Sequence, residues 1–182
     1  MLITYVLHVE DKPGVLNRVS SLVRRRGYNI ESLTVGHTDT SGVSRMTLVV
    51  DAEPSAAARI EANIYKLVHV LRVENVTALP TVYRYLALIK VAASVETRTQ
   101  VMQLVDVFRA RVVDVAPDSL MVEVTGTDEK IDGLLDILRP FGLLEVARTG
   151  QLAMTRGNAA RTAAPSVMES AEPVDAAVSF SV

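Results

Sequence analysis

A short charged segment near the amino terminus is the part of this sequence best suited to bind a small ligand. Residues 10–16 read Glu-Asp-Lys-Pro-Gly-Val-Leu and join a predicted strand to a predicted helix. A helix that begins near Val15 exposes unpaired backbone amides and a partial positive charge, which together can hold a carboxylate. Gly14 has no side chain to keep a ligand from the backbone, and Pro13 stiffens the turn. These residues fit a binding site and a simple tight turn equally well.

No other segment carries a known catalytic or nucleotide-binding pattern. The chain has no GxGxxG, GxxxxGK[ST], HExxH or GxSxG motif, and it has no cysteine for disulfides, thiolate chemistry or zinc. The three histidines, His8, His37 and His69, lie far apart in sequence. We interpret them as ordinary histidines, and we predict no catalytic residue and no metal site.

Three consecutive arginines at positions 24–26 follow the apolar part of the first predicted helix. Cations near the C-terminal end of a helix interact favourably with its dipole, by roughly 0.3–1 kcal/mol each. We favour this structural role over contact with a phosphate or an acidic partner, and the second interpretation stays open.

The connection at residues 10–16 is called the elbow. The spacing of apolar residues predicts the helices and strands that would position it. Apolar residues recur at helical spacing from Val15 to Val23 and again from Ile60 to Leu67, and Gly27 is placed to end the first helix. Runs rich in β-branched residues predict the strands. The resulting order is β-α-β-β-α-β, with strands at 2–9, 28–36, 44–51 and 69–78.

The same order recurs in the second half of the chain. Helical spacing marks 101–108 and 131–138, and strands are predicted at 83–92, 111–116, 119–125 and 143–149. This order predicts the α+β class, with two ferredoxin-like units that each carry both helices on one face of an antiparallel sheet. We expect domains at 1–79 and 80–156. Residues 157–182 are rich in Ala, Ser, Pro and Thr without any period, which predicts a disordered tail.

The overall composition excludes several classes of protein. The net charge of −2 gives no electrostatic reason to expect binding to nucleic acid or to an anionic membrane. No apolar run approaches the roughly 20 residues of a membrane span. The amino terminus lacks the basic region of a signal peptide. We therefore expect a cytoplasmic protein.

Several segments together resemble the small subunit of acetolactate synthase, also called acetohydroxyacid synthase, whose first unit is an ACT domain. The string RGYNIESLTV, from Arg26 to Val35, is highly specific to this family, whereas the elbow sequence DKPG occurs in many ACT domains. Further similar segments are SRMT at 44–47, KLVHVLRV at 66–73, LIKV at 88–91 and EVARTG at 145–150.

The resemblance implies a non-catalytic regulatory subunit that activates a separate catalytic subunit and confers feedback inhibition by a branched-chain amino acid, with valine the first choice. It implies a homodimer formed through the ACT domain, with the amino acid at the interface. The positions that match the family's ligand site are Asp11, Gly14, Val15, Leu16, Asn29 and Ile30. Relatives often carry Asn where this chain has Asp11, which bears on ligand affinity and choice. Thiamine diphosphate, FAD and magnesium are implied for the catalytic subunit, and no cofactor for this chain.

Three other classes of protein share part of this pattern. RNA-recognition motifs share the topology but need aromatic residues on the central strands, and the strand at 45–50 has none. An acylphosphatase-like hydrolase would need an arginine-bearing phosphate loop. Neither the connection at residues 10–16 nor the matching connection of the second unit, at residues 92–95, contains an arginine. A free-standing ACT-repeat sensor without an enzyme partner is the strongest alternative, and RGYNIESLTV argues against it.

Overall fold

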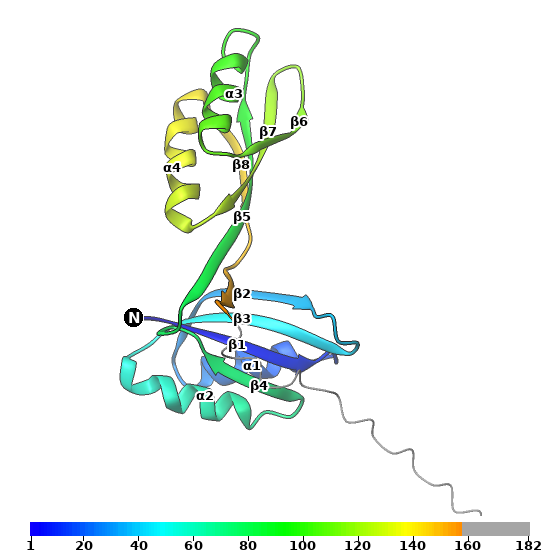
Figure 1. The fold of residues 1–182 in the computed structure, drawn as a ribbon, viewed down its shortest axis with the longest axis vertical. Helices are drawn as coiled ribbons and strands as arrows, with labels where there is room; N and C mark the ends of the chain where they lie inside the picture. Colours follow the sequence, from blue (N-terminus) through cyan, green and yellow to red (C-terminus); the bar gives the residue numbers. More distant parts are fainter. Residues whose placement is uncertain (158–182) are drawn as a thin grey trace, which may run out of the picture.

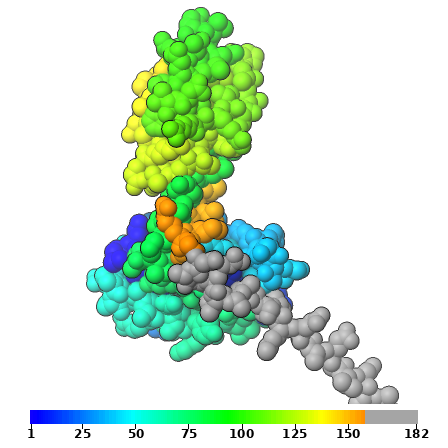
Figure 2. Space-filling model, in the orientation of Figure 1, coloured from blue at the N-terminus to red at the C-terminus, as the bar shows by residue number. Residues whose placement is uncertain are grey.

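The computed structural model describes residues 1–157, which form two lobes joined by a narrow waist (Figure 1). Figure 2 shows the second lobe standing clear of the first, with only the connecting chain between them. The predicted tail at 157–182 lies, apart from Gly157, outside the described residues.

The first lobe is a four-stranded antiparallel sheet of order β2-β3-β1-β4, with two helices on one of its faces. Val15, Val19 and Val23 recur every fourth residue along the first helix, so all three are buried against that sheet. Gly27, with φ +74°, follows the helix end as predicted. The elements are β1 (Leu2–Glu10), α1 (Val15–Arg25), β2 (Asn29–His37), β3 (Val43–Asp51), a 3-10 turn (Pro54–Ala56), α2 (Ala57–Tyr65) and β4 (Val70–Asn75).

The second lobe repeats this arrangement around its own core. The strand order is β6-β7-β5-β8, and Ile89, Val122 and Leu134 are fully buried between sheet and helices. The predicted α+β class with two ferredoxin-like units is therefore confirmed. The elements are β5 (Thr81–Ala92), α3 (Arg98–Val107), β6 (Arg111–Val115), β7 (Ser119–Gly126), α4 (Asp128–Leu138), a 3-10 turn (Arg139–Phe141) and β8 (Leu143–Arg148).

A ninth strand, which the sequence pattern did not predict, ties the two lobes together. β9 (Leu152–Thr155) pairs antiparallel with the first four residues of β5, so that β5 belongs to both lobes. This two-stranded ribbon stands on the face of the first sheet that the helices leave free (Figure 1). Ala153 is completely buried there in a small cluster with Val6 and Val76, against which Tyr83 packs. The first sheet is thus covered on both faces.

The chain crosses β2 closely just before β9 begins. The backbone amide of Gln151 donates to Ser32 Oγ at 2.6 Å, and Arg45 donates to the carbonyl oxygen of Ala153. A Cβ added at Gly150 would lie 2.8 Å from the carbonyl oxygen of Leu33 and 2.6 Å from Thr34 Oγ1. Only glycine fits at this crossing without moving the backbone.

We expect Gly150→Ala to lower the free energy of unfolding by about 1–3 kcal/mol, the usual cost of overpacking. The added methyl group meets a backbone carbonyl, which has little freedom to move. Gly36→Ala is the matched control, because nothing lies within 4 Å of a Cβ at that position of β2. Urea unfolding of both variants checks the prediction. Equal effects would show that the crossing at Gly150 is not tightly packed.

Candidate functional site

The elbow between β1 and α1 is held at two points by backbone hydrogen bonds from residues distant in sequence. The amide of Asp11 donates to the carbonyl oxygen of Gly42 at 2.8 Å, in the β2–β3 turn. The amide of Glu10 donates to the carbonyl oxygen of His69 at 2.9 Å, in the connection between α2 and β4. The elbow is therefore held between the β2–β3 turn and the α2–β4 connection of the same lobe.

Each carboxylate of the elbow has a basic partner. Glu10 Oε2 lies 2.6 Å from Lys12 Nζ and 3.0 Å from His69 Nδ1. The hydrogen bond from Lys12 is the main reason why the pKa of the Glu10 carboxyl group is lowered. Asp11 Oδ2 lies 3.5 Å from His37 Nδ1. Lys12 thus compensates the charge of Glu10, and the Asp11 carboxylate remains near the start of α1.

The start of α1 is open to a ligand. Gly14 precedes the helix in the left-handed conformation, with φ +84°, and no side chain caps the first amides. A Cβ at Gly14 would meet nothing within 4 Å. Val15 is buried beneath the helix start. Leu16 lies within the apolar spacing from Val15 to Val23 that predicts a buried helix face, but its side chain is 44% exposed. Open amides beside an exposed aliphatic side chain can receive a carboxylate that carries an apolar substituent.

The two remaining predicted site residues lie at the far end of the sheet within the same chain. Asn29 pairs with Asp51, which in turn pairs with Leu2, whereas the elbow follows Glu10 at the other end of β1. Eight residues of strand at about 3.3 Å each separate the two ends by roughly 26 Å. The fold thus brings Asp11, Gly14, Val15 and Leu16 together and leaves Asn29 and Ile30 apart from them.

Asn29 and Ile30 differ in their surroundings. The Asn29 side chain is exposed and donates to Glu31 Oε1. Ile30 is half-buried and packs against the core of the first lobe. A ligand could therefore reach the exposed Asn29 side chain if its hydrogen bond to Glu31 is exchanged, while Ile30 mainly supports the start of β2.

Sequence reasoning missed the residues that hold the elbow, namely His37, Gly42 and His69. His37 ends β2, Gly42 lies in the β2–β3 turn, and His69 lies between α2 and β4. All three follow the elbow by more than 20 residues, and no local pattern predicts such a pairing. His69 has a positive φ of 71°, which is unusual for a residue with a side chain and marks the loop as constrained.

Within residues 1–157, no three His, Asp or Glu side chains gather in a way that could hold a metal ion. In the same range no helix is long and apolar enough to cross a membrane.

Comparisons with known proteins identify both lobes. Residues 6–72 match the family model described as "AHAS small subunit-like ACT domain", and residues 84–157 match "Small subunit of acetolactate synthase". The "Probable acetolactate synthase small subunit" of Archaeoglobus fulgidus is 46% identical over 155 residues, which cover 85% of this chain and 97% of that protein. The chain belongs to the acetolactate synthase small-subunit family.

Other members of the family agree with this assignment. The "Acetolactate synthase small subunit" of Mycolicibacterium smegmatis is 49% identical over 149 residues, which cover 82% of this chain and 88% of that protein. The crystal structure of the small subunit from Thermotoga maritima superposes with a TM-score of 0.82 at 38% identity and covers 87% of this chain and 99% of that chain. Membership of this family makes the chain a regulatory, non-catalytic subunit of acetolactate synthase. The resemblance carried by RGYNIESLTV is confirmed.

Proposed function

We propose that this small subunit activates the catalytic subunit of acetolactate synthase and makes it sensitive to inhibition by a branched-chain amino acid, with valine as the preferred ligand. The observation that carries the proposal is the open start of α1: within residues 1–157, no side chain caps the helix, and a Cβ at Gly14 would meet nothing within 4 Å. In this proposal residues 1–79 sense the amino acid and form a homodimer, and residues 80–156 complete the regulatory subunit.

The position of β2 supports a site shared by two copies. Among the strands of residues 1–157, β2 pairs with β3 alone, which makes it an edge strand of the first sheet. If two β2 strands pair antiparallel across a two-fold axis, Asn29 at the start of one strand lies near His37 at the end of the other. His37 also contacts Asp11 at the elbow. Pairing at this edge would therefore bring Asn29 and Ile30 of one copy to the elbow of the other.

The chemistry of such a site fits a small apolar amino acid. The ligand carboxylate would accept hydrogen bonds from the amides at the start of α1, and the Asp11 carboxylate would accept one from the ligand ammonium group. The aliphatic side chain would lie against Leu16, which is otherwise exposed. Asn29 of the second copy would close the site with its amide group.

In this proposal, binding of the amino acid is coupled to the arrangement of the two ACT domains in the dimer. The amino acid must bind one arrangement of the ACT dimer better than another, since only this difference in affinity can shift the catalytic partner. The catalytic subunit would supply thiamine diphosphate, FAD and magnesium for the reaction. A cytoplasmic location, expected from the sequence pattern, is also part of the proposal.

Reconstitution with the catalytic subunit of the same organism tests the proposed function. We expect the small subunit alone to make no acetolactate from pyruvate, because its family supplies the regulatory chain. Added to the catalytic subunit, it should raise turnover, and valine should then inhibit the complex more strongly than the catalytic subunit alone. Leucine and isoleucine titrated in parallel rank the ligands. Unchanged turnover at saturating small subunit would favour the free-standing sensor instead.

A further inference from the structure

The outer side of the helical layer in the first lobe carries a concentration of positive charge. Two hollows lie along the groove between α1 and α2, with volumes of about 50 Å³ and 490 Å³, and no Asp or Glu lines either of them. We call this surface the α1–α2 groove. Its basic residues are Arg18, Arg24, Arg25, Arg26, Arg59 and Lys66.

These six cations have no acidic partner in the described part of the chain. Within residues 1–157, none of them forms an ion pair with a carboxylate within 4.0 Å. The Arg26 guanidinium donates to Asn63 Oδ1 at 3.4 Å, and the Arg25 guanidinium donates to the carbonyl oxygen of Ser21 at 3.3 Å. The chain as a whole has a net charge of −2, so this groove differs in sign from the protein average.

Favourable interaction with the helix dipole explains only part of this cluster. Arg24 and Arg25 lie in the last turn of α1, where cations are stabilised. Arg18, in contrast, lies near the start of α1, and Arg59 lies in the first turn of α2. Both are close to the positive end of a helix, and neither helix has an acidic residue in its first turn. Their presence opposes helix stability and therefore points to a role outside the helix.

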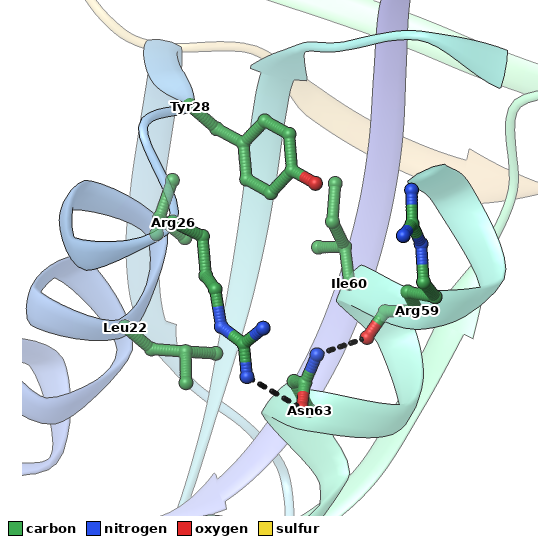
Figure 3. Close-up of a pocket in the computed structure, with 7 residues that line it drawn as sticks. Leu22, Arg26, Tyr28, Arg59, Ile60 and Asn63 are labelled. Atoms are coloured by element: carbon green, nitrogen blue, oxygen red, sulfur yellow. Dashed lines mark hydrogen bonds between the residues drawn. The ribbon is translucent and has the colours of Figure 1, made fainter. Parts of the chain in front are cut away.

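The groove also has apolar parts, which indicate what it binds. Figure 3 shows Arg26 and Arg59 on either side of the smaller hollow, with Tyr28 and Ile60 between them. Val68, at the edge of the larger hollow, is 65% exposed. A free phosphate would use the cations but gain nothing from these apolar side chains. A protein element with both acidic and apolar residues would use both.

We propose that the α1–α2 groove is the surface on which the small subunit binds an acidic, partly apolar element of the catalytic subunit. The proposal rests on the proposed function, because it requires the catalytic subunit as a partner. The amide of Arg18 donates to the carbonyl oxygen of Gly14 at 3.0 Å, so the groove begins one helical turn from the proposed amino-acid site. α1 thereby connects the two sites through one rigid element.

Charge reversal tests the α1–α2 groove. The test variant carries Arg25→Glu, Arg59→Glu and Lys66→Glu together, since all three side chains are exposed and make no ion pair in residues 1–157. Arg139→Glu is the control in the second lobe, because Arg139 follows the end of a helix, as Lys66 does, and its side chain is 69% exposed. Unlike the three test residues, Arg139 pairs with Asp136, so the control also reports the loss of a surface ion pair. A second triple variant carries glutamine at the same three positions. It removes the positive charges without adding negative ones, so it tests the groove even if the glutamate variant does not fold. Calorimetry measures the affinity of each full-length variant for the catalytic subunit.

We expect the glutamate variant to bind the catalytic subunit at least about tenfold more weakly, the glutamine variant to lie between it and the wild type, and the control to change less than about twofold. The affinity of the wild-type protein for the catalytic subunit should fall as salt is added. The affinity of the glutamine variant should fall less steeply with salt. Valine binding to each isolated variant should be unchanged.

Three results would overturn the assignment of the groove. The first is that both triple variants bind the catalytic subunit with the affinity of the wild-type protein. The second is a change confined to self-association of the small subunit, measured by sedimentation, which would assign the groove to contact between copies. The third is unchanged affinity for the catalytic subunit together with lost binding to anionic lipid vesicles. If the wild-type protein itself fails to bind the catalytic subunit, the proposed function fails as well.

Discussion

Gly14→Asp should give a complex that is still activated but that valine inhibits at least about tenfold more weakly. The new carboxylate would lie at the open amides of α1, where we place the carboxylate of the ligand. It would compete for the same donors and repel the ligand by like charge. Loss of one charge-assisted hydrogen bond costs roughly 1.5–3 kcal/mol, and about 1.4 kcal/mol corresponds to tenfold in affinity.

The backbone at Gly14 calls for a control that separates strain from charge. With φ at +84°, any other L-residue at this position is strained, and an aspartate there cannot be assumed to cap the helix from its usual extended conformation. Gly14→Ala shares the strain without the charge, and its Cβ meets nothing within 4 Å. Inhibition curves should therefore separate the two variants clearly. If both lose sensitivity equally, the elbow acts through its conformation, and if neither does, the ligand binds elsewhere.

Mixed dimers should recover valine binding that two inactive parents lack. One parent carries Gly14→Asp, and the other carries Asn29→Arg, which fills the opposite half of the proposed site with a larger, positively charged side chain. If each site takes its elbow from one copy and Asn29 from the other, a heterodimer has one intact site and one doubly altered site. Random association of equal amounts makes about half of the dimers heterodimers, so about a quarter of all sites should be intact.

Calorimetry on the co-expressed variants measures this fraction directly. Each parent alone should show no high-affinity site, and sedimentation should show that both still form dimers. A mixture that binds no more valine than its parents would place both halves of the site in one chain. The roughly 26 Å between Asn29 and the elbow would then have to close by a large rearrangement of the first lobe.

Local sequence was sufficient to predict the elements and their repeat. Helical spacing of apolar residues along α1 and β-branched runs along β1 reflect the faces that each element buries, and these periods are properties of the chain itself. The elbow was also visible, because Pro13 and Gly14 act on their own backbone. Gly27 marked the end of α1 for the same reason, and the structure shows a positive φ there.

Contacts between distant segments could not be predicted from local sequence. β9 pairs with the start of β5 from about 70 residues away, and its four residues have no period long enough to mark a strand. The burial of Val6 on the second face of β1 depends on that ribbon and not on the sequence around Val6. The links from Asp11 to Gly42 and from Glu10 to His69 are likewise visible only after the sheet has formed.

In the candidate sites, too, the local sequence predicted the chemistry, and the tertiary structure decided which residues come together. The types of residue at the elbow indicated what chemistry it could perform, since backbone amides, a glycine and a carboxylate act over a few ångströms within one turn. Only the strand order decided that Asn29 lies at the opposite end of the sheet, because an antiparallel sheet sends the two ends of each strand far apart. In the same way, Arg24–Arg26 was visible as a basic run, but the packing of α2 beside α1 decided that Arg59 and Lys66 join it in one groove.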